Sequence, residues 1–238
     1  MAVLDPDLLL RAYAIGVFPM SDSRDAKDVF WVEPKRRAII PLDGFHLSRS
    51  LRKAIRSGLF TVTRDIAFAE VVERCAERDE TWINTSIQES FSELHRLGHA
   101  HSIECWHEQE LVGGLYGVKL GGAFFGESMF SLRTDASKVA LAWLVARMKV
   151  GGYRLLDCQF MTEHLRSLGA IEITQKAYVS MLSDALSSSG VGAGAGRAGA
   201  GAGPEFGALD RLLGAESSRT VDAAASGCVI AQLLGQTS

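Results

Sequence analysis

The chain has 238 residues, of which 47% are hydrophobic, and a formal net charge of −3. This length and composition are typical of a globular protein with one good core or two small ones. The sequence contains no apolar run of about 18 residues, which a membrane-spanning helix needs. Asp5, Pro6 and Asp7 precede the first apolar run, so the N-terminus does not resemble the basic leader of a signal peptide.

The cysteines, which are Cys75, Cys105, Cys158 and Cys228, are widely spaced and form no Cys-x-x-Cys pair. This pattern argues against a disulfide framework and against a zinc ribbon. We therefore expect reduced thiols and a cytoplasmic protein that does not bind a membrane.

Charge is distributed unevenly along the sequence. Residues 35–64 contain eight basic side chains and one acidic side chain, whereas residues 65–110 contain eleven acidic and three basic ones. The positive excess predicts an anionic partner for the first stretch. A solvated surface is the alternative interpretation.

Short helices and strands alternate in the first part of the chain. The apolar spacing and the turn residues predict helices over 7–15, 49–56, 66–77 and 87–98, and strands over 29–31, 38–40 and 60–63. Ser48 is placed to cap the second helix, and Gly58 is placed to end it.

The second of these helices has a basic face. Its cations recur at i, i+3, i+4 and i+7, which places them along one side: Arg49, Arg52, Lys53 and Arg56. Leu51 and Ile55 fall on another side. A row of cations can hold phosphate groups without reading bases, so this face is a candidate nucleic-acid contact that Lys35 to Arg37 would extend.

From His99 the pattern changes to longer strands. It predicts a meander of strands over 102–106, 110–119 and 123–129, and then a long helix over 136–149. A strand over 154–160, a helix over 163–168, a strand over 171–173 and a helix over 175–186 follow. Antiparallel strands followed by alternating helices and strands indicate an α+β fold.

The composition changes again after Leu186. Residues 190–203 are nearly all glycine and alanine, which predicts a flexible linker. Residues 206–213 and 229–234 have the pattern of small helices but carry no recognisable chemistry. We expect residues 187–238 to form a flexible tail that is dispensable for function.

Two strands carry polar groups inside apolar sequence. Glu127 lies in the third strand of the meander, and Asp157 and Gln159 lie in the strand after the long helix. A buried polar group without a partner costs roughly 1–3 kcal/mol, so these groups need a reason to be there. On a strand, Asp157 and Gln159 share one face and Cys158 points to the other. The pattern predicts a site that holds an amine beside an apolar group.

Other interpretations of these residues are open. Asp157 can equally cap a loop or pair with an arginine. A nucleophilic Cys158 with His164 is disfavoured, because Cys158 faces away from its polar neighbours. His95, His99 and His101 do not form a standard metal-ligand spacing with a carboxylate or cysteine, so we expect no metal.

Across about Leu8 to Leu186 the sequence contains seven motifs in order. They are Gly16-Val17-Phe18-Pro19-Met20, Leu47-Ser48-Arg49-Ser50, Thr81-Trp82-Ile83, Leu97-Gly98-His99-Ala100-His101-Ser102-Ile103-Glu104, Leu111-Val112-Gly113-Gly114-Leu115-Tyr116-Gly117, Phe125-Gly126-Glu127-Ser128-Met129-Phe130-Ser131 and Asp157-Cys158-Gln159. In order and spacing they resemble the bacterial leucyl/phenylalanyl-tRNA–protein transferases.

The resemblance implies an enzyme that moves leucine or phenylalanine, and less readily methionine, from aminoacyl-tRNA to a protein with N-terminal arginine or lysine. The product would be marked for degradation by the Clp protease in the N-end rule pathway. The implied fold is a small N-terminal α/β domain over 1–64 followed by an acetyltransferase-like (GNAT) domain over 65–186, with a mostly antiparallel sheet from about residue 99. We expect a monomer without a cofactor.

By the same resemblance, Asp157 and Gln159 are catalytic, and Glu127 is the next candidate. Our hypothesis is that Gln159 hydrogen-bonds the attacking amine, while Asp157 orients Gln159 and offsets the developing positive charge. Glu127 would position the amine or the basic side chain of the acceptor.

The resemblance also implies sites for the donor. The donor side-chain pocket is Leu115, Phe124 and Met129, the terminal adenosine lies near Trp31 and Trp82, and the tRNA acceptor stem lies on Arg49, Arg52, Lys53 and Arg56. Leu115 replaces a methionine that is often found there, which leaves the ranking of donors open.

Three alternative functions remain. An N-acetyltransferase is disfavoured because residues 131–137 contain no glycine for a pyrophosphate loop, and Asp135 would repel phosphate. Leucyl transfer to N-terminal aspartate or glutamate is disfavoured because Glu127 and Asp157 would repel such an acceptor. A non-catalytic tRNA-binding module would bind tRNA without using Asp157 or Gln159.

Overall fold

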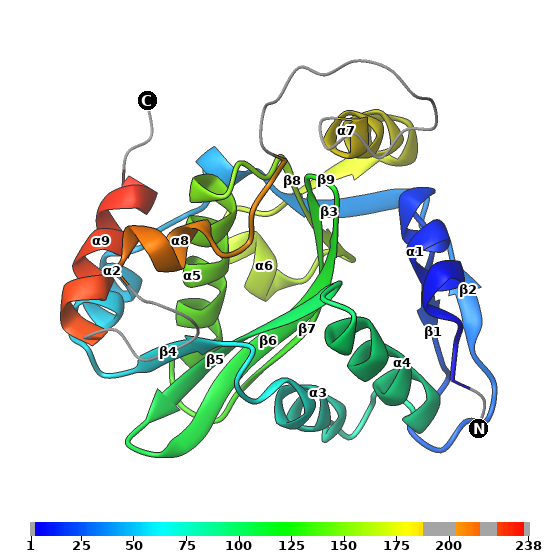
Figure 1. The fold of residues 1–238 in the computed structure, drawn as a ribbon, viewed down its shortest axis with the longest axis horizontal. Coiled ribbons are helices and arrows are strands. Elements are labelled where there is room, and N and C mark those ends of the chain that lie inside the picture. The colour runs from blue at the N-terminus through cyan, green and yellow to red at the C-terminus, as the bar shows by residue number, and fades with distance from the viewer. Residues whose placement is uncertain (1–2, 188–202, 215–222, 236–238) are drawn as a thin grey trace.

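The structure is a computed structural model that describes residues 3–187, 203–214 and 223–235 (Figure 1). The linker expected over 190–203 therefore lies, apart from Gly203, outside the described residues. Within the described residues, no helix is both long enough and apolar enough to cross a membrane.

Its centre is a seven-stranded sheet with the order β4-β5-β6-β7-β8-β3-β9. The strands are β3 (Arg36–Ile40), β4 (Thr61–Arg64), β5 (Ala100–His107), β6 (Glu110–Leu120), β7 (Ala123–Ser131), β8 (Leu155–Gln159) and β9 (Ile171–Thr174). All neighbouring pairs are antiparallel except β7 with β8, which is parallel. The expected α+β class and mostly antiparallel sheet are therefore confirmed. A separate ribbon is formed by β1 (Phe18–Met20) and β2 (Phe30–Val32).

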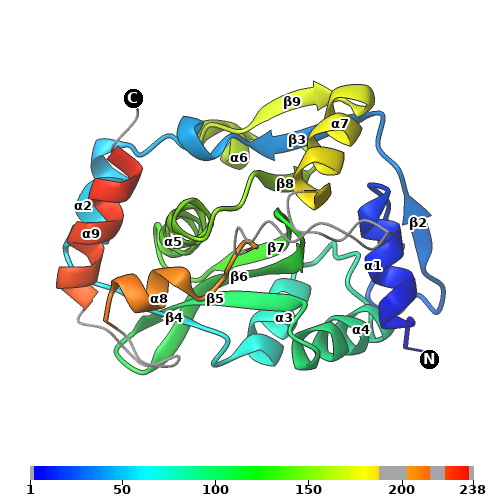
Figure 2. The same cartoon turned by 45° about the horizontal axis from the view of Figure 1, so that its top comes forward.

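Helices cover both faces of the sheet (Figures 1 and 2). One face is packed by α2 (Arg49–Arg56), α5 (Ala136–Val150), α6 (Glu163–Ser167), α8 (Ala208–Leu212) and α9 (Ala223–Gly235), with the 3₁₀ turn Leu42–Gly44 beside them. The other face is packed by α1 (Pro6–Ala14), α3 (Phe68–Ala76), α4 (Thr85–Arg96) and α7 (Gln175–Ser187). Each face has its own apolar cluster, so the sheet is the middle of three layers.

Residues 1–64, expected as an N-terminal domain, contribute two strands to the central sheet. Strand β3 is hydrogen-bonded between β8 and β9, and β4 is the edge strand beside β5. Helix α1 contributes Leu9 and Tyr13 to the same apolar cluster as α3 and α4. Strand order is set by tertiary packing rather than by local sequence, so the periodicity of residues 36–64 does not reveal this insertion.

The described parts of the C-terminal segment are packed on the core, which differs from the flexible tail expected from the composition. Phe206 stacks between His101 and Phe124, with ring centroids 4.2 Å and 5.5 Å away. Asp210 forms an ion pair with Arg147 over 2.5 Å. The physical reason is that the two small helices predicted here present buried apolar residues, among them Ile230 of α9.

Strands β7 and β8 pair only over a short stretch. Ala123, Phe124 and Phe125 lie opposite Leu155, Leu156 and Asp157. Beyond that point β7 stays with β6, whereas β8 stays with β3. The two strands therefore separate, and the sheet opens between them.

Candidate active site

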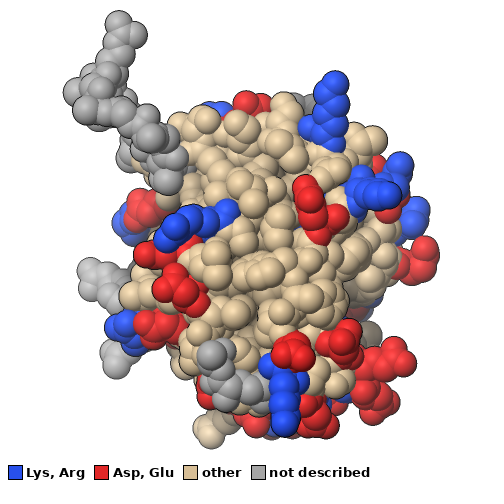
Figure 3. All heavy atoms as spheres, turned by 90° about the vertical axis from the view of Figure 1, so that its right-hand side faces the viewer, with Lys and Arg blue, Asp and Glu red and all other residues tan. Residues whose placement is uncertain are grey.

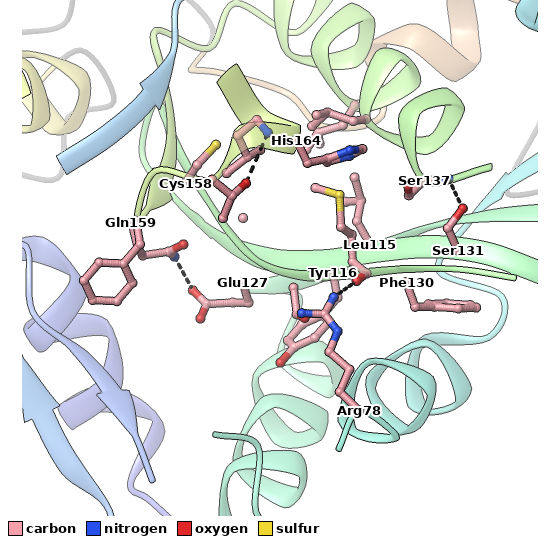
Figure 4. A pocket seen from close by; sticks show the side chains of 18 of the residues that line it. Arg78, Leu115, Tyr116, Glu127, Phe130, Ser131, Ser137, Cys158, Gln159 and His164 are labelled. Carbon is pink, nitrogen blue, oxygen red and sulfur yellow. Dashed lines mark hydrogen bonds between the residues drawn. The ribbon is translucent and has the colours of Figure 1, made fainter. Parts of the chain in front are cut away.

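A cavity of about 850 Å³ lies where β7 and β8 separate (Figure 4). Its volume is within the range of roughly 300–1,000 Å³ that is typical of small-molecule sites. Figure 4 shows Glu127 and Gln159 at one end and Leu115 further along the cavity. Arg78, which follows α3, lies at its edge. One cavity therefore combines a polar end with an apolar part.

The apolar part is formed by side chains from several elements. Its aliphatic lining residues include Leu115 of β6, Met129 of β7, Leu141 and Leu144 of α5, Leu156 of β8 and Leu165 of α6. Leu115 and Met129 were predicted from the sequence, whereas the four others were not. The signal for Leu141 and Leu144 was the apolar run 139–146 within the long helix, which needs a second packing surface besides the sheet. This lining is suited to binding an aliphatic or aromatic side chain.

Glu127 is 9% exposed and lies at the polar end of the cavity. The Tyr13 hydroxyl donates to its Oε1 over 2.8 Å, and Gln159 Nε2 donates to the same oxygen over 3.2 Å. Burial raises the pKa of Glu127 to about 8, and the hydrogen bond from Tyr13 opposes that rise only in part. The carboxyl can therefore take or release a proton near neutral pH. Tyr13 was not predicted as a site residue, because it lies on α1, far from β7 in sequence.

Gln159 ends β8 in a left-handed backbone conformation with φ of 55°. Its backbone N–H donates to Asp157 Oδ1 over 2.9 Å, while its carboxamide reaches Glu127. Gln159 lines the cavity together with Glu127, so the structure brings these two predicted residues together.

Asp157 lies behind the cavity and does not line it. It is 0% exposed, and the Arg37 guanidinium clamps its carboxylate, with Nε 2.9 Å from Oδ1 and Nη2 2.6 Å from Oδ2. The Tyr178 hydroxyl donates to Oδ2 over 2.8 Å. Asp157 therefore holds Gln159 by its backbone, and its charge is already paired inside the protein. The part of our hypothesis in which Asp157 offsets charge on the substrate is not supported by this geometry.

Arg37 belongs to the basic run that the sequence suggested as an extension of a phosphate-binding surface. It is 1% exposed and paired with Asp157, so that interpretation of Arg37 is wrong. Burial would lower the pKa of Arg37, but its hydrogen bonds and charge interaction with Asp157 outweigh that effect and raise the pKa overall. Arg36 is exposed and forms an ion pair with Glu172, so its charge is also already paired and we do not assign it to the phosphate-binding surface.

The two tryptophans suggested for the adenosine lie in different places. Trp82 lines the cavity. Trp31 lies on β2 and is 40% exposed. It is paired with Pro19 of β1, whereas the residues on either side of Pro19 line the cavity, namely Phe18 and Met20. Because alternate residues of a strand face opposite sides, Trp31 points away from the cavity.

Phe124 does not line the cavity either. Its ring is fully buried and stacks on Phe206, nearly parallel at 3°. The structure therefore gives Phe124 a packing role beside the C-terminal segment and leaves Leu115 and Met129 as the predicted pocket residues that reach the cavity.

Helix α2 has the expected basic face, but the cations are not equivalent. Arg49, Lys53 and Arg56 are exposed. Arg52 is partly buried, and its Nη1 donates to the Ala231 carbonyl of α9 over 3.2 Å. Ser48 caps the helix as predicted. None of the four lines the cavity.

The two ends of the molecule differ in charge. Helix α2 lies on the left in Figures 1 and 2, at the opposite end from β1 and β2. Figure 3 shows that opposite end, where acidic side chains gather along the lower edge and a broad area above them carries little charge. The exposed cations of α2 are therefore remote from Trp31, which lies on β2.

Cys158 and His164 both line the cavity. Cys158 packs towards the cluster around α5, whereas Asp157 contacts Tyr178 on the other face, as the strand alternation predicted for these two residues. Gln159, however, lines the same cavity as Cys158, so the expected separation of Cys158 from Gln159 is not observed. Burial raises the pKa of the Cys158 thiol, so it does not supply a thiolate near neutral pH. This agrees with the view that Cys158 is not a nucleophile.

Two family models match the sequence. Residues 39–183 match leucyl/phenylalanyl-tRNA protein transferase, and residues 2–35 match the N-terminal domain of the same family. A leucyl/phenylalanyl-tRNA--protein transferase from Rhizorhabdus wittichii is 62% identical over an alignment of 248 residues. The alignment covers 100% of this chain and 100% of that protein. One from Zymomonas mobilis is 62% identical over 190 residues, which cover 78% of this chain and 71% of its own length.

Among solved structures, that of L-PGS from Bacillus licheniformis is similar with a TM-score of 0.39 and 14% sequence identity. The match covers 66% of this chain and 53% of that one. A likeness this weak bears on neither the fold nor the chemistry. The family matches, by contrast, span most of the sequence at high identity. The chain therefore belongs to the leucyl/phenylalanyl-tRNA protein transferase family and is an aminoacyltransferase.

Proposed function

We propose that the protein transfers leucine or phenylalanine, and less readily methionine, from aminoacyl-tRNA to proteins with N-terminal arginine or lysine. The observation that carries this proposal is the single cavity that joins an apolar part to the pair Glu127 and Gln159. The apolar part would take the donor side chain, and the polar end would take the acceptor amine. No cofactor is needed, because the aminoacyl ester is already activated.

The leucine-lined part of the cavity supports donors with large apolar side chains. Leu115, Leu141 and Leu144 approach it from β6 and α5. An apolar pocket separates donors that differ by one methylene by only about 1–3 kcal/mol. Some tolerance among leucine, phenylalanine and methionine is therefore expected.

The reaction is attack of a neutral α-amine on the ester carbonyl. A C–N bond forms, the ester C–O bond to the terminal ribose breaks, and the proton that the amine loses is balanced by one that the ribose oxygen takes up to become a hydroxyl. An α-amino group has a pKa of about 8, close to the pKa of about 8 of buried Glu127. Proton transfer between them is nearly balanced, so Glu127 is our candidate for the proton acceptor, with Gln159 hydrogen-bonding the amine.

A carboxyl at the polar end favours a basic acceptor over an acidic one. When Glu127 is ionised it attracts the side chain of arginine or lysine and repels aspartate or glutamate. Much of the rate would come from holding amine and ester together in the cavity.

The exposed cations of α2, Arg49, Lys53 and Arg56, would contact the tRNA backbone, and Trp82 would stack on the terminal adenosine. The meander, the long helix α5 and the parallel strand β8 support an acetyltransferase-like (GNAT) arrangement. We further propose a cytoplasmic monomer whose products are degraded by the Clp protease through the N-end rule pathway.

Radiolabelled Leu-tRNA, mixed with peptides that differ only in a first residue of arginine, aspartate or alanine, tests the proposal. We expect label on the arginine peptide alone. Label on the aspartate peptide would overturn the acceptor assignment. Binding of tRNA without transfer to any peptide would indicate a non-catalytic module.

A further inference from the structure

The conformation of Gln159 is unusual for a residue with a side chain. Its φ of 55° is in the left-handed region, which L residues other than glycine rarely adopt. The ladder with β3 is irregular at the same place, because Ile39 pairs with Asp157 and Ala38 pairs with Gln159, which leaves Cys158 as an extra residue. Bulges of this kind re-aim side chains next to active sites.

Asp157 is the residue that holds this conformation. Its Oδ1 accepts the Gln159 backbone N–H over 2.9 Å, which fixes the turn at the end of β8. The direction of the Gln159 carboxamide towards Glu127 therefore depends on where the Asp157 carboxylate lies. That carboxylate is itself positioned by Arg37.

Arg37 connects several elements around this point. Besides clamping Asp157, its Nη1 donates to the Gly16 carbonyl over 2.9 Å. Its guanidinium lies over the rings of Phe18 and Tyr178, 4.7 Å and 4.4 Å from their centroids. Phe18 is itself a wall of the cavity. The guanidinium thus ties β3 to the turn before β1, to α7 and to the end of β8.

We propose that Arg37 is a positioning residue for aminoacyl transfer. Its forked guanidinium fixes Asp157, and Asp157 fixes Gln159 so that the carboxamide meets the amine at Glu127. This inference rests on the proposed function. Arg37 touches neither substrate, so its loss slows the chemical step and leaves tRNA binding intact.

Arg37→Lys is the first test, because lysine keeps the positive charge but cannot form the bidentate hydrogen bonds that the guanidinium makes to the Asp157 carboxylate. We expect the single-turnover rate of leucine transfer from Leu-tRNA to an arginine peptide to fall about 10- to 100-fold. The Kd for Leu-tRNA should change by less than about twofold, since phosphate contacts dominate that affinity.

Arg37→Ala provides the second test, because it leaves a space that free guanidinium ion can enter. Added guanidinium, at a concentration too low to denature the protein, should raise the transfer rate of this variant and not that of the wild type. Loss of a residue that only stabilises the fold would lower the number of active molecules but not the transfer rate of each active molecule. Rates are therefore expressed per active site, measured from the amplitude of the single turnover.

The neighbouring arginine on the same strand is the matched control. Arg36 forms an exposed ion pair with Glu172, so Arg36→Lys and Arg36→Ala should keep the wild-type rate and show no response to guanidinium. If Arg37→Ala does not fold, Tyr178→Phe replaces it, because that change removes one hydrogen bond to Asp157 and should slow transfer severalfold.

A wild-type rate per active site in Arg37→Lys would overturn the inference. So would a rate in Arg37→Ala or Tyr178→Phe that equals that of the Arg36 controls. If the wild type transfers no leucine to the arginine peptide, the proposed function fails and the inference fails with it.

Discussion

Gln159 donates a hydrogen bond of 3.2 Å to Glu127 across the opening between β8 and β7. The two strands are paired by their backbones up to Phe125 and Asp157, and two residues later the side chains of Glu127 and Gln159 bridge the gap. The same Glu127 oxygen accepts from Tyr13 of α1, so two elements fix the carboxyl. An amine that enters must share or replace these hydrogen bonds, which makes Glu127 the most sensitive group of the site.

The first prediction concerns the pH dependence of stability. Burial raises the pKa of Glu127 from 4.5 to about 8, so the folded state binds this proton more tightly than the unfolded chain does. The resulting stabilisation is complete below about pH 4.5 and is lost as the pH rises through about 8. Relative to Glu127→Gln, the unfolding free energy of the wild type should therefore fall as pH increases over this window, with each pKa unit worth about 1.4 kcal/mol.

Urea denaturation of both proteins across this pH range measures the difference. A difference that stays constant with pH would show that the pKa of Glu127 is the same in the folded protein as in the unfolded chain.

The second prediction concerns donor choice. Leu144→Phe narrows the apolar part of the cavity, so the transfer of phenylalanine should slow more than the transfer of leucine, whose side chain is smaller. We expect the ratio of kcat/KM for Phe-tRNA to that for Leu-tRNA to fall about tenfold. Leu132→Ala is the control, because Leu132 lines the cavity but is 56% exposed. An unchanged ratio in Leu144→Phe would show that the donor side chain does not bind in this cavity.

The third prediction concerns α2. Replacing Arg49, Lys53 and Arg56 by glutamine should weaken tRNA binding and flatten its salt dependence. For each phosphate group that the triple variant no longer neutralises, the slope of log K against log salt should become shallower by about 0.7–0.9. Salt titrations of tRNA binding measure this slope.

The matched control for α2 removes the same charge elsewhere. Arg11, Arg166 and Lys176 are exposed on α1, α6 and α7, and their combined change to glutamine should leave the slope nearly unchanged. Equal slopes for the two triple variants would show that α2 has no special part in tRNA binding.

The fourth prediction concerns the C-terminal segment, where Asp210 pairs with Arg147 and Arg64. Arg147 is buried, so Asp210→Ala should leave its charge uncompensated and lower the unfolding free energy by about 3 kcal/mol. Glu205→Gln is the control, because its ion pair with Arg211 is exposed and screened by water, so its loss should leave stability nearly unchanged. Equal stability of the two variants in urea would show that the segment is not held by this pair.

The parts of the site that follow from local pattern could be predicted from the sequence. Strands β6, β7 and β8 were expected within one or two residues of their observed bounds. Polar residues inside those apolar strands pointed to Glu127 and Gln159, and both line the cavity. Strand alternation is a local property, which is why these assignments needed no tertiary information.

The clamp on Asp157 could not be found in this way. Arg37 is 120 residues away in sequence, and it reaches Asp157 only because β3 pairs with β8. In the sequence it is one of three consecutive basic residues, which suggests a surface. Its position directly before the buried run of β3 was the available signal that it needs a partner.

The C-terminal segment was misjudged for a different reason. Its average composition is dominated by glycine and alanine, which hides the few large apolar residues that dock it. Ile230 and Leu234 are spaced by four, so they lie on one face of α9, and Phe206, in the turn before α8, is buried together with Leu209 of α8. This docked segment lies beyond both family matches.

The most direct test of the account is the single-turnover rate of leucine transfer from Leu-tRNA to an arginine peptide in the wild type and in Glu127→Gln. Glutamine keeps the shape of the side chain but cannot take a proton from the amine. We expect transfer per active site to fall by about 10²- to 10⁴-fold, while tRNA binding is kept. A Glu127→Gln variant that transfers leucine at the wild-type rate would contradict the assignment of this cavity as the site of transfer.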